Sequence, residues 1–307
     1  MHSAGIHHIT AIAGDPQTNL DFYIATLGLR LIKRTVNFDD PGSYHFYFGD
    51  NIGSPGTIIT FFPWPGARRG TRGSGQVTVV SFAIPVNSIA MWRERLREND
   101  IVAEEISDRF GTKALRFLDP DGLMLELIES PIVPGEGGMG HNIHGFAAPT
   151  LEVRHVERTE KLLIEILGFE FVGEEGNRRR LRGSGSNAAA VDLVSSDAGF
   201  GLVAVGSVHH IAFRVENDEE QLRVREKIVE RGLNVTPVID RQYFHSIYFR
   251  EPNGILFEVA TDGPGFLIDE SADELGESLK LPPMYESARS EIERVLPPIQ
   301  LRHATAS

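Results

Sequence analysis

DPDGLMLELIES at 119–130 and EPNGILFEVATD at 251–262 follow nearly the same pattern. Each begins with a turn of the order acid-Pro-Asp/Asn-Gly and continues into a strand-like run with a glutamate at the same place, Glu126 or Glu258. Repetition at a fixed offset is the signature of a duplicated structural unit. A carboxylate in an apolar strand also needs a partner, and a metal ion is one candidate.

The repeat extends upstream of these turns. RERLRENDIV at 93–102 matches REKIVERGLN at 225–234 at the offset of 132 residues that relates the two glutamates. A second pair, 22–31 and 162–171, recurs at an offset of 140. In that pair an amphipathic helix is expected to end at a glycine and to lead into a strand. The chain therefore repeats a unit made of a strand, a helix and further strands.

We predict an α+β protein of four such modules, at 5–63, 76–130, 141–196 and 206–262. Stretches rich in glycine or proline at 65–75 and 131–140 are interpreted as linkers. The second linker divides the chain into two predicted domains, 1–135 and 136–265. Residues 266–307 are expected to form a tail, with helical spacing of apolar residues near 283–295.

Composition excludes several classes of function. The 307 residues are 41% apolar and 24% charged, which is ordinary for a soluble globular protein. The formal charge of −13 argues against nucleic acid and anionic membranes as partners. The absence of cysteine excludes disulfides, thiolate metal sites and cysteine nucleophiles. With neither a long apolar run nor a signal-peptide pattern, the expected location is the cytoplasm, with no membrane as a partner.

Two adjacent histidine pairs, His7-His8 and His209-His210, open the predicted first strands of modules one and four. Neighbouring residues of a strand point to opposite faces. His7 and His209 share their faces with apolar residues only, whereas His8 and His210 lie on the more polar faces. In strands without a bulge, His8 and His210 are therefore the two that face a ligand.

Glu258 lies in the last strand of module four and completes a set of two imidazoles and one carboxylate. Such a triad leaves metal positions open for substrate and dioxygen. Fe(II) is the metal that this set most often holds, and Mn(II) fits the same ligands. The predicted metal ligands are thus His8, His210 and Glu258.

The other modules lack these residues. The offsets place Thr78 and Ala148 where a histidine would be needed, and Thr60 where module one would need its glutamate. We therefore expect one complete triad, with its parts in modules one and four, and interpret Glu126 as a relic or a structural carboxylate. A site built from modules three and four would instead use His144 in place of His8.

Modules with His8, His210 and Glu258 at these places resemble the vicinal oxygen chelate superfamily, which includes glyoxalases and extradiol dioxygenases. The chain is most similar to ring-cleaving dioxygenases of the 2,6-dichlorohydroquinone 1,2-dioxygenase type. The similarity covers nearly the whole chain, through residues 6–10, 44–50, 55–63, 241–248, 258 and 281–283. It implies four βαβββ modules in two glyoxalase-like domains, and the same three iron ligands.

The resemblance also implies residues around the metal. Its pattern places substrate-binding residues at His7 and Thr10, and catalytic groups at His209, Arg241 and Tyr248. Strand alternation turns His7 and His209 away from the pocket, which conflicts with these roles. A β-bulge would remove the conflict.

The expected function is that of a non-haem Fe(II) dioxygenase that inserts O2 into a hydroquinone or a related dihydroxylated ring. Its partners would be a small aromatic substrate and O2, and a homo-oligomer is compatible with such an enzyme. One alternative is a glyoxalase-like isomerase or lyase, which would need a fourth protein ligand where Thr60 stands. Another is a metal-free protein that binds aromatic compounds.

Overall fold

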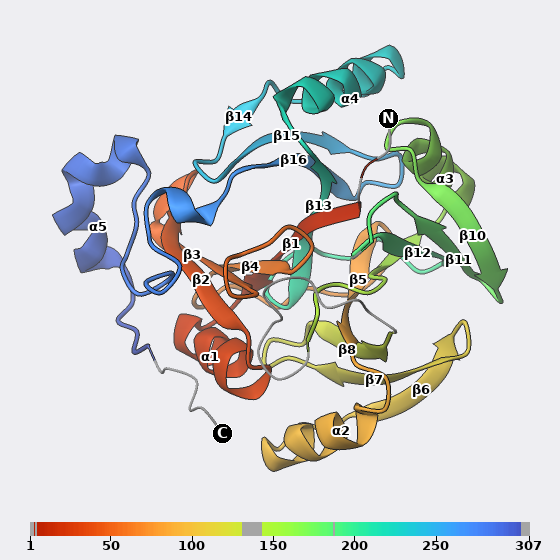
Figure 1. Ribbon diagram of the computed structural model, residues 1–307, viewed down its shortest axis with the longest axis horizontal. Coiled ribbons are helices and arrows are strands. Elements are labelled where there is room, and N and C mark those ends of the chain that lie inside the picture. The colour runs from red at the N-terminus through yellow and green to blue at the C-terminus, as the bar shows by residue number, and fades with distance from the viewer. Residues whose placement is uncertain (1–2, 4, 131–142, 187, 302–307) are drawn as a thin grey trace.

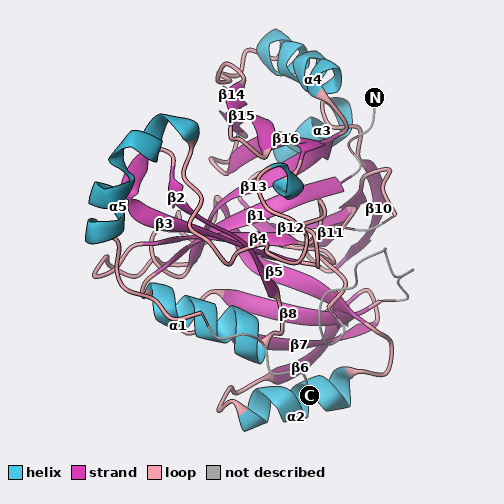
Figure 2. Ribbon diagram, turned by 60° about the vertical axis from the view of Figure 1, so that its left-hand side comes forward, coloured by secondary structure: helices cyan, strands magenta, loops and turns pink. Residues whose placement is uncertain are grey.

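The computed structural model describes residues 3, 5–130, 143–186 and 188–301. These residues form two curled eight-stranded sheets with helices on their outer sides, so the predicted α+β class is confirmed (Figures 1 and 2). The first sheet has the order β14 (Ile239–Asp240), β15 (Phe244–Arg250), β16 (Leu256–Pro264), β13 (Ser207–Val215), β1 (Gly5–Ala13), β4 (Ile58–Pro63), β3 (Asp40–Gly49), β2 (Arg30–Asn37). The second has the order β10 (Glu170–Glu175), β11 (Arg178–Arg182), β12 (Ala190–Ser195), β9 (Thr150–Val153), β5 (Gln76–Ile84), β8 (Met124–Glu129), β7 (Thr112–Leu118), β6 (Glu104–Arg109).

All four modules have the same βαβββ topology, with the first strand parallel to the last. Modules one and four share the first sheet, joined by the antiparallel pair β1 and β13. Modules two and three share the second, joined by β5 and β9. Each sheet thus combines strands from both sides of residue 135, while the domain boundaries at 135 and 265 stay a prediction. The linker predicted at 131–140 lies outside the described residues.

The helices lie outside the sheets and begin at local sequence signals. Asp15 accepts a hydrogen bond from the Thr18 amide at the start of α1, and Asn217 caps α4 in the same way. Three acidic residues in the first turn of α4 also favour the positive end of the helix dipole. The helical segments are α1 (Pro16–Asp21), η1 (Phe22–Thr26), α2 (Ile89–Glu98), α3 (Val156–Glu165), α4 (Asp218–Glu230), η3 (Phe266–Ile268), η4 (Pro283–Ala288) and α5 (Arg289–Val295).

The two repeated turns dock on helices of the preceding modules. Asp119 accepts two backbone N–H bonds within its own turn and a third bond from the Tyr23 hydroxyl, at 3.0 Å. Glu251 does the same in its turn and accepts from the Thr159 hydroxyl at 2.6 Å. Modules one and two are therefore held together across the sheets, as are modules three and four.

Glu126 takes part in an ion-pair cluster inside the second sheet. Its carboxylate is fully buried and accepts hydrogen bonds from Arg109 and Arg116. Arg109 also pairs with the buried Asp192 at 3.1 Å. Glu126 stands opposite Ser81 as Glu258 stands opposite Ala212 in the first sheet, so the two glutamates occupy equivalent positions. In the second sheet the negative charge of the Glu126 carboxylate is balanced by the guanidinium groups of Arg109 and Arg116.

The C-terminal segment runs along the outer edge of the first sheet, beside β2 and β3 (Figure 1). Lys33 of β2 is fully buried and bonds to Asp269 at 2.6 Å and to Glu270. The Tyr44 hydroxyl donates to the Pro297 carbonyl further along. Among the described residues, no helix is long and apolar enough to cross a membrane.

Candidate metal centre

Three buried side chains from three neighbouring strands of the first sheet converge on one point. His8 comes from β1, His210 from β13 and Glu258 from β16, and they are 2%, 5% and 0% exposed. Glu258 Oε2 lies 2.8 Å from His210 Nε2 and 3.3 Å from His8 Nε2. The two Nε2 atoms are 3.4 Å apart. The structure thus brings the three predicted ligands together, although they are up to 250 residues apart in the chain.

Both histidine pairs lie at irregularities of the β1–β13 ladder. Ile6 is opposite Phe213 and His8 is opposite Ala212, so the ladder skips His7. Further along, Thr10 is opposite His210 and Ala11 is opposite Val208, so it skips His209. A bulge leaves its extra residue unpaired and changes the direction of the neighbouring side chains. Strict alternation of faces therefore fails at both pairs.

The bulges allow the two rings of each pair to meet. His7 Nδ1 lies 2.9 Å from His8 Nδ1, and His209 Nδ1 lies 2.8 Å from His210 Nδ1. Burial lowers the pKa of His7 well below its usual value and lowers the pKa of His209 to about 3, so both rings are neutral and can accept a hydrogen bond. His8 and His210 can then donate through Nδ1, which leaves their Nε2 lone pairs for a metal.

A divalent cation fits this arrangement. Burial alone would raise the pKa of Glu258, but His8 and His210 hold it well below its usual value, so the carboxylate is ionised. Its Oε1 accepts from Ser246, whereas the buried Oε2 makes no hydrogen bond of acceptable geometry among the described residues. Two imidazole nitrogens and one carboxylate oxygen facing one point repel each other unless a cation lies between them. These residues could hold Fe(II) or Mn(II).

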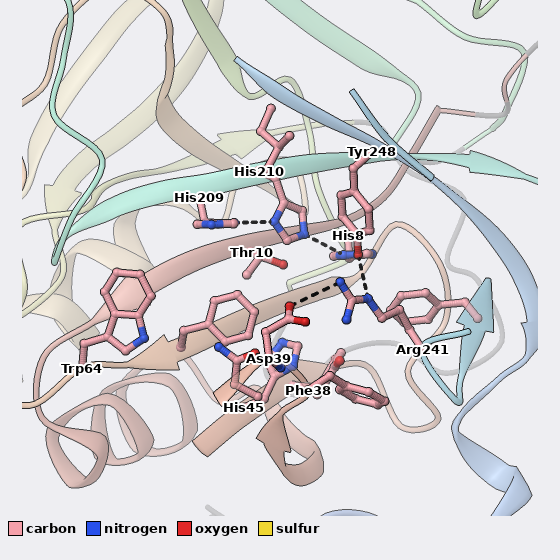
Figure 3. A pocket seen from close by; sticks show the side chains of 15 residues that line it. His8, Thr10, Phe38, Asp39, His45, Trp64, His209, His210, Arg241 and Tyr248 are labelled. Carbon is pink, nitrogen blue, oxygen red and sulfur yellow. Dashed lines mark hydrogen bonds and ion pairs between the residues drawn. The ribbon is translucent and has the colours of Figure 1, made fainter. Parts of the chain in front are cut away.

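A cavity of about 360 Å³ opens beside this triad (Figure 3). Its walls are mainly aromatic, which suits a flat ring. Arg241 spans one side: its Nε donates to the Tyr248 hydroxyl at 3.2 Å, and its Nη2 lies 3.6 Å from Asp39. The lining also includes Thr10, His45, Tyr47, Phe62, Trp64 and Phe244.

The other predicted site residues are placed as follows. Thr10, His209, Arg241 and Tyr248 all line the cavity. His7 is not among the lining residues; it lies behind His8, with its ring 5.0 Å from that of Phe244. Of the histidines outside the predicted site, His144 borders a separate cavity of the second sheet, so it is not a neighbour of the triad.

Sequence reasoning missed His45, which lines the same cavity. It lies on β3 two residues before Tyr47, whose main chain is opposite that of Thr60 on β4. Alternation along β3 would have placed His45 and Tyr47 on one face, but only the register to β4 shows that this face is the cavity.

Comparison with known proteins shows the family of this chain. The model of the glyoxalase/bleomycin resistance protein/dioxygenase superfamily matches residues 5–127 and 145–259. The chain belongs to this superfamily. The two matched segments each contain two of the four modules, in line with the repeated topology of the sheets.

Individual relatives cover nearly the whole chain. A protein of Bacillus subtilis (strain 168) with the name "Putative ring-cleaving dioxygenase MhqO" is 48% identical over 97% of both chains. The chlorohydroquinone/hydroquinone 1,2-dioxygenase of Sphingobium indicum is 35% identical over 95% of both. The crystal structure of a "putative dioxygenase" from Bacillus subtilis subsp. subtilis str. 168 has 48% sequence identity and superposes with a TM-score of 0.94, over 98% of this chain and 99% of that one.

Proposed function

We propose that this member of the superfamily is a non-haem Fe(II) dioxygenase that cleaves the ring of a hydroquinone or a related diphenol. The observation that carries the proposal is the buried set of His8, His210 and Glu258 beside a cavity with aromatic walls. The names of the relatives support the same reaction class. The proposed partners are a small aromatic substrate and O2, and the proposed setting is aromatic catabolism in the cytoplasm.

His8, His210 and Glu258 would hold the metal, with Mn(II) as the second candidate. Fe(II), when bound there, supplies the redox chemistry by which electrons of the ring reach O2, and it brings the two reactants together. Neighbouring side chains hold these ligands in place by hydrogen bonds. Ser246 donates to Glu258, and the preceding histidines orient His8 and His210.

Arg241 and Tyr248 would act on the aromatic oxygen. The guanidinium carries a fixed positive charge at the side of the cavity and can stabilise a phenolate by a charge-assisted hydrogen bond. Tyr248 accepts a hydrogen bond from Arg241, so its own phenol proton can be donated to a bound oxygen. His209 and Thr10, on the cavity wall, would orient the same end of the substrate.

The isomerase alternative is less favoured by the residue at the fourth ligand position. Thr60 stands where module one would need its glutamate, and its hydroxyl bonds to His45 and Thr10. A threonine used in this way does not complete a four-ligand protein site. Turnover of a methylglyoxal–thiol adduct by the Ni(II) or Zn(II) form, without O2 uptake, would favour the isomerase.

Oxygen consumption tests the proposal directly. The protein would be reconstituted anaerobically with Fe(II) and then mixed with O2 and hydroquinone, catechol or phenol. A dioxygenase places both oxygen atoms in its product, so one O2 should be consumed per ring without an added reductant. Glu258→Gln should abolish the uptake, whereas Glu129→Gln, on the neighbouring sheet, should not. If no diphenol supports uptake by the iron form, the proposal fails.

A metal content below about 0.1 per chain after purification without chelators, together with ligand affinity unchanged in His8→Ala, would favour the metal-free binding protein.

A further inference from the structure

Asp39 lies at the mouth of the cavity beside the metal triad. It belongs to the turn between β2 and β3, and its side chain is 81% exposed. Its Oδ2 atom lies 3.6 Å from Nη2 of Arg241, which comes from the last module of the chain (Figure 3). An acidic side chain of module one therefore meets the guanidinium of module four at the edge of the cavity.

Three contacts hold the turn that carries Asp39. The Asp39 amide donates to Asn37 Oδ1 at 3.0 Å, within the turn itself. The Phe38 carbonyl accepts from the Tyr285 hydroxyl of the C-terminal segment at 2.8 Å. The Phe38 ring lies beside the Arg241 guanidinium, with 5.7 Å between its centroid and Cζ. The place of Asp39 beside Arg241 is thus set by the fold as well as by the ion pair.

Arg241 keeps N–H groups that are available to a ligand. Its Nε donates to the Tyr248 hydroxyl at 3.2 Å, whereas the 3.6 Å between its Nη2 and Asp39 is too long for a hydrogen bond. The side chain is 18% exposed and lines the cavity. A guanidinium in such a place attracts any anionic group of a bound compound, including a carboxylate attached to an aromatic ring.

We propose that Asp39 is a specificity-determining residue, which disfavours aromatic compounds that carry an anionic group on the ring. The proposal rests on the dioxygenase function proposed above and names the compounds that its site rejects. A carboxylate drawn to Arg241 also approaches Asp39, which has the same charge and repels it. Two like charges about 4 Å apart in water weaken binding about fivefold. A diphenol is uncharged at neutral pH and escapes this repulsion.

Binding to a redox-inert form measures this role without catalysis. The full chain loaded with Zn(II) would be titrated in a calorimeter with phenol, 4-hydroxybenzoate and 4-hydroxybenzenesulfonate. The two acids place one negative charge on the same ring, and the sulfonate is the weaker metal ligand of the two. The quantity compared between proteins is the ratio of the affinity for each acid to the affinity for phenol.

Two neighbouring substitutions make the same change of net charge. Asp39→Asn keeps the size of the side chain and removes its charge, and it should raise the ratio about fivefold for both acids. Asp40→Asn is the matched control, because Asp40 is exposed and borders a different cavity. It should leave the ratio unchanged. A ratio in Asp39→Asn equal to that of the wild type, or an equal rise in Asp40→Asn, would overturn the proposal.

The iron form distinguishes the two proposals from each other. Catechol and 3,4-dihydroxybenzoate would be compared there, and Asp39→Asn should raise kcat/KM for the acid relative to catechol about fivefold, through KM. If Asp39→Asn changes the binding ratio of the Zn(II) form but no diphenol supports O2 uptake, the dioxygenase function fails while the role of Asp39 stands. If the iron form consumes O2 and Asp39→Asn leaves the relative kcat/KM unchanged, the role of Asp39 fails while the dioxygenase function stands.

Discussion

Glu126→Gln and Glu258→Gln are the same chemical change at equivalent positions of the two sheets, and they should have opposite effects. Glu126 is fully buried and accepts hydrogen bonds from Arg109, from Arg116 at 2.7 and 2.9 Å, and from Ser81 at 3.0 Å. Neutral glutamine leaves the fully buried Arg109 with Asp192 at 3.1 Å as its remaining acidic partner among the described residues. Breaking a buried pair in this way costs about 3–5 kcal/mol of the free energy of unfolding.

Glu258→Gln should leave the metal-free fold nearly intact. Its partners are Ser246 and two imidazoles, and none of these is a permanent cation. The loss should instead be in metal affinity, by at least about 100-fold, because a ligand is removed from the centre itself. A metal present at 100 times its Kd stabilises the folded protein by about 2.7 kcal/mol, and this increment should vanish.

Urea unfolding with and without Mn(II), together with metal analysis of each purified protein, measures both quantities. Glu126→Gln should lower stability but keep the full metal increment, whereas Glu258→Gln should lose the increment alone. Glu129→Gln on the same strand as Glu126 is the matched control, because Glu129 is only partly buried and its carboxylate accepts a long hydrogen bond, at 3.3 Å, from the Ile89 amide. Equal effects of the two main variants on metal binding would refute the asymmetry between the sheets.

Three further predictions concern the surroundings of the site. His209→Phe removes the Nδ1 partner of His210 and should weaken Mn(II) binding about 10–100-fold, measured by competition with a chelator. Lys33→Met leaves two carboxylates without their buried cation and should cost about 3–5 kcal/mol in urea unfolding, with metal affinity unchanged. Burial raises the pKa of Asp119 to about 7, so the folded state binds its proton more tightly than the unfolded state and stability falls as pH rises from about 4 to 7. Asp119→Asn should remove up to about 4 kcal/mol of this fall, and an unchanged pH profile of unfolding would contradict it.

The modules could be predicted because their signals are local. The acid-Pro-Asp/Asn-Gly turns before Glu126 and Glu258 and the helices ahead of them are each specified within a short stretch of sequence. How the modules pair could not be read in this way. The pair β1 and β13 joins residues about 200 positions apart, and no local pattern favours it over a pairing of modules one and two.

Backbone irregularities explain the remaining differences at the site. The sequence offset aligned Thr78 with His210, whereas the strand registers align Val79 with His210. Ser81 pairs with Glu126 in the second sheet as Ala212 pairs with Glu258 in the first. Val79 and His210 each lie two residues before these positions. The bulges at His7 and His209 also depend on both strands of the ladder, so one strand's sequence does not reveal them. Side-chain alternation predicts a site only where the ladder is regular.

One physical requirement accounts for both halves of the duplication. A carboxylate buried at the same place in each sheet needs a cation. In the second sheet the cation is Arg109, which is attached to the chain and fills its place permanently. In the first sheet no arginine or lysine among the described residues pairs with Glu258, and two imidazoles face it instead. A cation from solution can fill this place, so the half that lacks a built-in charge is the half that can bind a metal and leave positions open for chemistry.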